Sequence, residues 1–160
     1  MTAARVVVID DTQANLILLA NLLQEAGHEV RVANSAQRGL TLIEKQPPDL
    51  VLLDVNLPDR DGFDVCEDLK RNPALRHVPV LFLSAHDDAI SRNRGFAAGG
   101  SEYLVKPFEA AEILARVDHY LALARLQREN ARLRDLVARC ADLDVSKRPT
   151  QDELDAALRG

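Results

Sequence analysis

The sequence predicts an α/β fold: a doubly wound parallel sheet of five strands, with an extended last helix. Three observations lead to this fold class. Short segments rich in valine, isoleucine and leucine alternate with longer segments whose apolar residues recur every three or four positions, which is the pattern of strands joined by crossover helices. Two of the short segments are apolar throughout, as in parallel strands buried on both faces. The final helical pattern is much longer than the others.

The elements can be assigned in order along the chain. Residues 5–10 form a β-branched apolar strand that ends in an acidic residue. Residues 12–26 place leucines three or four positions apart, and Gly27 follows as a helix C-cap, so this segment is predicted to be a helix. The alternation continues with strands at 29–33, 49–54, 78–84 and 102–105 and helices at 35–45, about 62–71 and about 87–98.

The last helical pattern begins at Phe108 and continues to about Cys140. Such a helix of about 33 residues would span about 50 Å at 1.5 Å per residue, which is too long to lie wholly on a small domain. In the tail that follows, Thr150 and Glu153 form a capping box that opens a short helix. This tail either folds back on the long helix or is a linker from a longer protein. We therefore predict a domain at 1–122, a helix extension at 123–140, and a tail or linker at 141–160.

Composition and charge exclude several classes of function. The 25 acidic and 20 basic residues give a formal net charge of −5, so no overall positive field favours nucleic acid or an anionic membrane. Aromatic residues make up 4% and tryptophan is absent, which argues against a base-stacking surface. Two cysteines cannot form a disulfide framework, and no apolar run reaches the roughly 20 residues of a membrane span. The first residues also lack a long apolar stretch of the signal-peptide kind. We therefore expect a cytoplasmic protein.

Acidic residues lie at the ends of the first and third predicted strands. Asp10 and Asp11 follow the first strand, and Asp54 ends the third. Doubly wound sheets bind their ligands at the carboxyl ends of the strands, so the three carboxylates converge if these two strands are neighbours. Clustered carboxylates repel one another unless a cation is bound, and oxygen ligands without histidine or cysteine favour Mg²⁺ or Mn²⁺.

Two further strand-end residues suit a phosphoryl group. Ser84 ends the fourth strand with a hydroxyl donor, and Lys106 follows the fifth strand with a positive charge. A divalent cation, a lysine and a hydroxyl around a carboxylate suit phosphoryl transfer, in which positioning and charge neutralisation dominate. Asp54 then remains as the nucleophile. No glycine-rich phosphate loop follows any predicted strand, which argues against nucleotide binding.

Each of these residues also has a purely structural interpretation. Asp11 could cap the helix that follows it, and Asp54 could be a turn residue. Ser84 could be a strand-end donor, Lys106 a solvated charge and Tyr103 a residue that fills an edge strand. The agreement of five positions at separate strand ends, in chain order, favours the functional interpretation.

Four sequence motifs resemble the successive signatures of two-component receiver domains, which are the phosphoacceptor domains of response regulators. They are VVVIDD at 6–11, LVLLDVNLPDRDG at 50–62, VLFLSA at 80–85 and YLVKPF at 103–108, and the resemblance covers about residues 4–124. It implies the flavodoxin-like strand order 2-1-3-4-5. It also implies a phosphorelay partner, either a histidine kinase or a histidine phosphotransfer protein.

The resemblance implies roles for the residues around the acceptor. Asp54 would be the phosphoacceptor and Asp11 a direct Mg²⁺ ligand. Asp10 would act on the metal through water, and Asn56 would provide its backbone carbonyl. Lys106 would contact the phosphoryl group, aimed into the cleft by a cis bond to the following proline.

The same resemblance implies a switch and a control of lifetime. Ser84 would be the switch hydroxyl, and Tyr103 would be the aromatic residue whose rotamer follows it. Asn56 and His86 would flank the route of the attacking water and tune the lifetime of the phosphorylated form. For His86, a solvent-exposed loop histidine without such a role is the alternative.

An apolar heptad seam runs through the helix extension. Its positions are spaced 3-4-3-4-3 and include an asparagine at an a position, which predicts a parallel two-stranded coiled coil and hence a homodimer. The outer faces are basic, but no second recognition element follows, so we interpret them as solvated and do not expect direct DNA binding. The seam residues are Leu123, Leu126, Asn130, Leu133, Val137 and Cys140.

These inferences predict a regulatory phosphoacceptor protein rather than an enzyme that acts on a separate substrate. Phosphorylation of Asp54 would draw Ser84 and Tyr103 inward and repack the face formed by the fourth helix, fifth strand and fifth helix, and so change the coiled coil. Two alternatives stay open. In the first, the chain is the regulatory input of a larger output enzyme, such as a cyclase or kinase. In the second, it is a stand-alone adaptor or shuttle.

Overall fold

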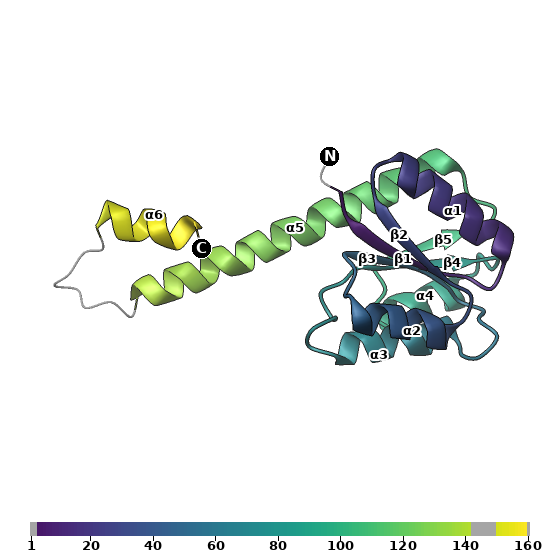
Figure 1. Cartoon of the computed structure of the whole chain (residues 1–160). Coiled ribbons are helices and arrows are strands. Elements are labelled where there is room, and N and C mark those ends of the chain that lie inside the picture. Colours follow the sequence, from purple (N-terminus) through teal and green to yellow (C-terminus); the bar gives the residue numbers. More distant parts are fainter. Residues whose placement is uncertain (1–2, 142–149, 160) are drawn as a thin grey trace. The chain divides into compact units, whose positions relative to one another are not determined.

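A computed structural model of the chain describes residues 3–141 and 150–159. Strands and helices alternate from β1 to α5 (Figure 1). The strands are β1 (Arg5–Ile9), β2 (Glu29–Ala33), β3 (Leu50–Asp54), β4 (Val80–Ser84) and β5 (Glu102–Val105). The helices are α1 (Gln13–Glu25), α2 (Ala36–Lys45), α3 (Gly62–Arg71), α4 (Ala89–Ala97), α5 (Ala110–Ala141) and α6 (Gln151–Arg159).

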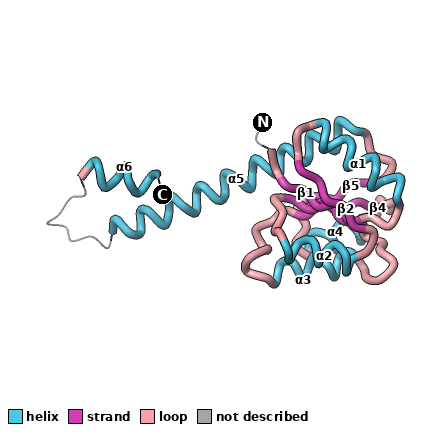
Figure 2. The backbone as a smooth tube through the Cα atoms, viewed as in Figure 1, coloured by secondary structure: helices cyan, strands magenta, loops and turns pink. Residues whose placement is uncertain are grey.

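The five strands form one parallel sheet in the order β2-β1-β3-β4-β5 (Figure 2). This confirms the predicted doubly wound sheet and its order 2-1-3-4-5. The central strands β1 and β3 are neighbours, and Ile9 lies opposite Leu53, so Asp10 and Asp54 reach the same edge of the sheet. The strand order reverses at this point, which is where such sheets bind their ligands.

Helices cover both faces of the sheet. On one face, Leu19 and Leu23 of α1 share a core with Ile113 and Val117 of α5. On the other face lie α2, α3 and α4 (Figure 1), and the core there includes Ile43 of α2, Phe63 of α3 and Phe82 of β4. The strands β3 and β4 are buried along their whole length, which explains why their sequences are apolar up to the last residue, Asp54 in β3 and Ser84 in β4.

Several element boundaries differ from the prediction by one or two residues, and two of the differences have a visible cause. α1 begins at Gln13 rather than at residue 12, and its N-cap is Thr12, which makes no side-chain cap hydrogen bond. The structural interpretation of Asp11 as the helix cap is therefore wrong. β4 begins at Val80 rather than at Val78, because the Val78 amide closes the preceding turn instead of joining the sheet.

α5 is a continuous helix of 32 residues, which confirms the predicted long last helix. Its buried side chains run from Ile113 to Ala124, and the residues beyond them are mostly exposed. The chain divides into two compact units, residues 1–124 and 125–160. Neither α5 nor any other helix in the described residues is both long and apolar enough to cross a lipid bilayer.

α6 begins with the predicted capping box. Thr150 Oγ1 accepts a hydrogen bond from the Glu153 N–H (3.2 Å), and Glu153 Oε2 accepts one from the Thr150 N–H (3.4 Å). Arg132 of α5 donates a hydrogen bond to the carbonyl of Leu158 (2.9 Å), so α6 lies against α5 within the second unit. The predicted break in the helical pattern after Cys140 falls on residues 142–149, outside the described residues.

Candidate functional site

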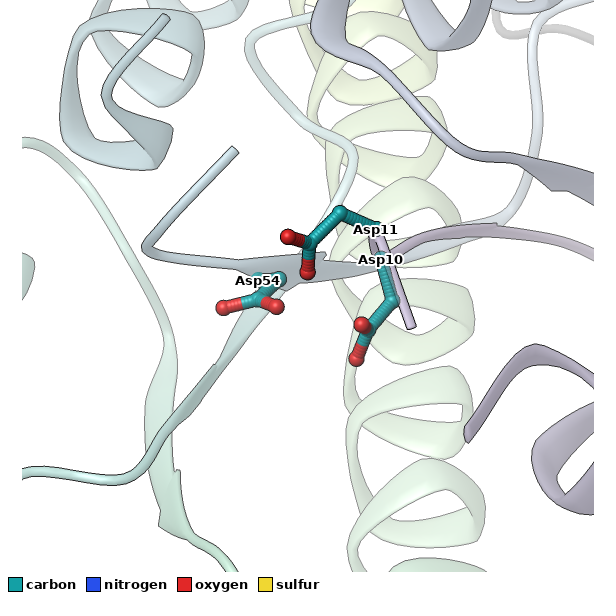
Figure 3. Close-up of side chains that lie close together, drawn as sticks. All are labelled: Asp10, Asp11 and Asp54. Carbon is teal, nitrogen blue, oxygen red and sulfur yellow. The ribbon is translucent and has the colours of Figure 1, made fainter. Parts of the chain in front are cut away.

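Three aspartate side chains meet at the carboxyl ends of β1 and β3. One carboxylate oxygen from each of Asp10, Asp11 and Asp54 lies within 4.8 Å of the others (Figure 3). Asp10 and Asp54 are buried, whereas Asp11 is exposed and its carboxylate has no hydrogen-bond partner among the described residues. The convergence expected from the strand ends is therefore present in the structure.

Lys106 contacts two of these three carboxylates. Its Nζ donates hydrogen bonds to Asp10 Oδ2 and to Asp54 Oδ2, each at 3.0 Å. The Lys106–Pro107 peptide bond is cis, as the resemblance implies. Because the Lys106 side chain is only 20% exposed and holds both buried carboxylates, it is not the solvated charge of the structural interpretation.

The turns after β1 and β3 hold the buried carboxylates in place. Asp10 Oδ1 accepts a hydrogen bond from the Thr12 N–H (2.8 Å), and Asp10 Oδ2 accepts one from the side chain of Asn15 (3.3 Å). Asp54 Oδ1 accepts a hydrogen bond from the Asn56 N–H (3.0 Å). These bonds fix both side chains in the absence of any ligand, so the site is preorganised.

The pKa of Asp54 is raised from 3.8 to about 6. Burial of the carboxylate is the main cause, the hydrogen bonds from Lys106 and from the Asn56 backbone offset part of it, and the charge of Asp10 adds to it. Burial lowers the pKa of Lys106, but its hydrogen bonds to Asp54 and Asp10 and their charges outweigh burial and raise it. The carboxylates thus carry more negative charge than one ammonium neutralises. A further cation would favour the ionised form of Asp54.

The donor set fits a hard divalent cation. The cluster offers three carboxylates at one point and contains neither histidine nor cysteine. Mg²⁺ and Mn²⁺ prefer such oxygen ligands. Asp10, Asp11 and Asp54 are the groups that could hold such a cation.

Ser84 and Tyr103 meet at the loop that follows β4. Ser84 is buried, and its Oγ accepts a hydrogen bond from the His86 N–H (3.1 Å). The Tyr103 hydroxyl donates a hydrogen bond to the His86 carbonyl (2.8 Å), and the Arg92 guanidinium lies 5.3 Å from the centre of the tyrosine ring. The ring of Tyr103 is already buried, so the inward movement expected from the sequence is not needed to bury it. The side chains of His86 and Asn56 are exposed.

No motif or periodicity indicates that Asp59 caps a helix distant in the chain. Its two carboxylate oxygens accept hydrogen bonds from the N–H groups of Ala36 and Gln37 at the start of α2, each at 2.9 Å. The hydrogen bonds from Gln37 and Ala36 lower the pKa of Asp59. The local cap Ser35, which accepts from the Arg38 N–H, is visible in the sequence, but a cap supplied from another loop is not.

A second unforeseen contact joins the same loop to α4. Asp61 caps α3 by accepting a hydrogen bond from the Phe63 N–H (2.8 Å) and also forms an ion pair with Arg94 of α4 (3.2 Å). The Arg94 guanidinium lies 4.8 Å from the centre of the Phe63 ring. The loop that begins directly after Asp54 is therefore tied to α2 by Asp59 and to α4 by Asp61.

The predicted seam residues lie on α5, and none of them contributes to the aspartate cluster. Leu126 and Val137 are 63% and 67% exposed, Leu123 and Leu133 are exposed to a smaller degree, and Cys140 is partly exposed. Within the described residues, this half of α5 therefore presents a strip of open apolar side chains.

Comparisons with known proteins show which family the chain resembles. The sequence matches the response regulator receiver domain family over residues 6–118. It is 39% identical over 115 residues to the response regulator PleD of Caulobacter vibrioides, and 40% identical over 113 residues to the DNA-binding dual master transcriptional regulator RpaA of a Synechocystis strain. These alignments cover 72% and 71% of this chain but only 25% and 47% of the relatives, so the chain spans less than half of their length.

Solved structures share the same fold. NtrX from Brucella abortus superposes with a TM-score of 0.78 at 30% identity, over 83% of this chain and 30% of that one. The chemotaxis response regulator CheY4 of Vibrio cholerae superposes with a TM-score of 0.71 at 28% identity, over 74% of this chain and 99% of that one.

The sheet order and the acidic strand ends define a phosphoacceptor-type α/β domain. The chain belongs to the response regulator receiver domain family. Members of this family act in two-component phosphorelay signalling, where they take phosphoryl groups from histidine kinases or phosphotransfer proteins.

Proposed function

We propose that this chain is a regulatory phosphoacceptor whose Asp54 takes a phosphoryl group from the phosphohistidine of a histidine kinase or a histidine phosphotransfer protein. The observation that carries the proposal is the meeting of Asp10, Asp11 and Asp54 around a point that Lys106 only partly neutralises. Such a site keeps an excess of negative charge, which a bound cation would balance. The cation and Lys106 together could then stabilise a phosphoryl group on Asp54.

The transfer breaks one bond and forms another. A carboxylate oxygen of Asp54 attacks the phosphorus, the P–N bond of the donor breaks, and the electron pair of that bond returns to the imidazole nitrogen. The product is a mixed anhydride, an aspartyl phosphate. Lys106, which holds Asp54 at 3.0 Å, is placed to exchange a carboxylate oxygen for a phosphoryl oxygen and to stabilise its charge.

A bound divalent cation would be held by Asp10, Asp11, Asp54 and the Asn56 carbonyl, with Asp10 acting through water. When bound, it supplies the positive charge that stabilises the phosphoryl oxygens in the transition state. The residues of the chain keep the acceptor oriented: the Asn56 N–H and the Lys106 ammonium each hold one of the two oxygens of Asp54.

The proposed switch residues are Ser84, at the carboxyl end of β4, and Tyr103, on the neighbouring strand β5. Ser84, buried next to the acceptor, can donate its hydroxyl to a phosphoryl oxygen, and its own acceptor capacity is used by the His86 N–H. Movement of Ser84 would shift the loop that also binds the Tyr103 hydroxyl, and with it the face formed by α4, β5 and α5. Asn56 and His86, whose side chains are exposed, would set the rate at which water attacks the phosphoryl group.

The output proposed for this switch is a change in a dimer. The exposed strip of Leu123, Leu126, Leu133 and Val137 suits a parallel two-stranded coiled coil, in which Asn130 would pair with its counterpart. The strip lies on the helix whose first half packs on the sheet, so a change at the sheet can reach it through one continuous element.

One observation supports a second candidate, in which the chain is the regulatory input of a longer protein. The relatives it matches are two to four times longer than the matched region. In that case the coiled coil would transmit the state of Asp54 to an output domain, while the phosphoacceptor chemistry stays the same.

The proposal is tested by phosphorylating the purified chain with acetyl phosphate and Mg²⁺ and measuring its intact mass. We expect one phosphoryl group, labile to hydroxylamine, in the native chain and none in Asp54→Asn. Chelation with EDTA should lower the rate at least tenfold. A native chain that is not phosphorylated, or an Asp54→Asn variant that is phosphorylated equally well, would overturn the proposal.

A further inference from the structure

The exposed strip of α5 is flanked by one pair of opposite charges. With Asn130 at position a of the heptad, Glu129 occupies the preceding g position and Arg134 the following e position. In a parallel, in-register two-stranded coil, a g residue of one helix faces the e residue five positions later in the other helix. Glu129 and Arg134 have this spacing.

Neither charge is used inside the part of the chain that the structure describes. In the same stretch of helix, Arg139 forms an ion pair with Asp135 one turn earlier (3.0 Å). Glu129 and Arg134 form no such ion pair with any described residue. Both charges thus lie beside the apolar strip without an ion pair to a described residue, although Glu129 also borders the small pocket between α5 and α6.

α6 does not cover the middle of this strip. It meets α5 on the side of Leu136, where the two helices line a small pocket and Leu158 accepts a hydrogen bond from α5. That side lies roughly a quarter turn around the helix from the middle of the strip. Leu126 and Val137 stay 63% and 67% exposed, and only Leu133 borders both the pocket and the strip. Space for a further helix therefore remains.

We propose that a second copy of this chain occupies the strip in a parallel, in-register pair, in which Glu129 of each copy faces Arg134 of the other. The inference rests on the parallel dimer proposed above and adds the charge contacts that would hold it in register. An antiparallel pair would instead bring g against g and e against e, so that Glu129 meets Glu129 and Arg134 meets Arg134.

The other flanking positions do not oppose the parallel arrangement. They carry no charge, so the attraction of the two symmetric Glu129–Arg134 pairs is the only charge contact at the flanks of the seam over this stretch. The pairs lie on either side of Asn130, whose amide would hydrogen-bond its counterpart in the same register. The uncharged flanking residues are Ala122, Gln127, Leu136 and Ala141.

Charge reversal in the full chain tests this pairing. Glu129→Arg and Arg134→Glu each replace two attractions by two repulsions and should weaken dimerisation, measured by sedimentation equilibrium, about tenfold. The double variant restores opposite charges and should return to within about twofold of the native chain. Asp135→Arg and Arg139→Glu are matched controls, because they change the net charge equally on the outer face of the helix and should have less than about a twofold effect.

Cys140 provides an independent measure of orientation. It lies at a d position, so parallel copies in register bring the two thiols together, and mild oxidation should give a covalent dimer that Cys140→Ser prevents. Cys66 does not compete, because it is buried and its pKa is raised by burial to about 11.

The outcomes separate the pairing from the dimer itself. A dimer that is not weakened by the single reversals, not restored by the double variant, or not cross-linked through Cys140 overturns the parallel, in-register pairing and leaves only dimerisation itself standing. A native chain that is monomeric at all concentrations overturns both. Phosphorylation of Asp54, measured by intact mass, is independent of either result.

Discussion

Lys106 and Asp54 are joined by a hydrogen bond of 3.0 Å between Nζ and Oδ2, although β5 and β3 are separated by β4 in the sheet. The same ammonium binds Asp10, at the end of β1. One ammonium group therefore reaches the carboxyl ends of both central strands and binds two buried carboxylates. Without a bound metal ion, the stability of the protein depends on the balance of charge at this point.

Asp54→Asn should raise the free energy of unfolding of the cation-free protein by about 1–3 kcal/mol at pH 7. The pKa of Asp54 is raised from 3.8 to about 6, so the folded protein keeps this proton to a higher pH than the unfolded chain does. The stability linked to that proton is complete below about pH 4 and is lost as the pH rises through about 6. Urea unfolding in EDTA at pH 5 and pH 7 measures the difference, and an advantage of the variant that does not shrink toward pH 5 would contradict this account.

Lys106→Met should destabilise the cation-free protein by about 1–3 kcal/mol at pH 7, because it leaves the buried carboxylates of Asp10 and Asp54 without their cation. The pKa of Asp54 should rise further above about 6, as a carboxyl-carbon NMR titration would show. Added Mg²⁺ should recover part of the stability but not the phosphorylation rate, which should fall at least tenfold. Lys106→Arg is the control that retains the charge, and equal stability of the Met variant and the native chain would exclude this role.

Asp59→Ala should lower the free energy of unfolding by about 1 kcal/mol, because two N–H groups at the start of α2 lose their acceptor. The hydrogen bonds from Gln37 and Ala36 lower the pKa of Asp59, so its contribution is present above the unfolded pKa near 4 and is lost as the pH falls through the lower folded value. Asp59→Asn should lose less than Asp59→Ala. Glu44→Ala, an exposed acid on the same helix, should be neutral within about 0.5 kcal/mol.

Tyr103→Phe should destabilise the protein by about 0.5–1.5 kcal/mol, because the His86 carbonyl loses the hydrogen bond from the tyrosine hydroxyl. The rate at which Asp54 is phosphorylated should stay the same, since the ring lies outside the aspartate cluster. The change in backbone amide NMR shifts of α4 upon phosphorylation should become smaller. If phosphorylation changes these shifts as much in Tyr103→Phe as in the native chain, the hydroxyl takes no part in the switch.

His86→Ala should slow the hydrolysis of the aspartyl phosphate about 2- to 10-fold, because an exposed imidazole beside the site can accept a hydrogen bond from the attacking water. Hydrolysis is followed as the loss of phosphorylated mass after removal of the donor. The hydrolysis rate of His86→Gln, which keeps a hydrogen-bond acceptor, should lie between the rates of His86→Ala and of the native chain. A decay rate identical to that of the native chain would remove His86 from the mechanism and leave it as a loop residue.

Much of the candidate site could be predicted because its residues stand where strands end. Asp10 follows β1, Asp54 and Ser84 end β3 and β4, and Lys106 follows β5. A strand is recognisable from its apolar sequence, and parallel strands bring their carboxyl ends to one edge, so local patterns were enough to gather these four residues.

The contacts that could not be predicted join loops distant in the chain. Asp59 binds backbone N–H groups of α2, and Asp61 pairs with Arg94 of α4, although no periodicity or motif links these positions. The buried position of the Tyr103 ring was also missed, because a rotamer depends on the packing of neighbouring elements rather than on the strand pattern.

The first half of α5 restricts the way in which a signal can travel along it. Ile113, Val117 and Leu121 are buried in the core shared with α1. Sliding the helix along its axis by one turn, about 5.4 Å, would withdraw these side chains from that core, at a cost of about 1.5–3 kcal/mol each. That sum exceeds the roughly 1–3 kcal/mol that couples two sites in a typical regulatory protein. Phosphorylation would therefore rotate the paired helices or change their separation, without translating either α5 along its axis relative to its own sheet.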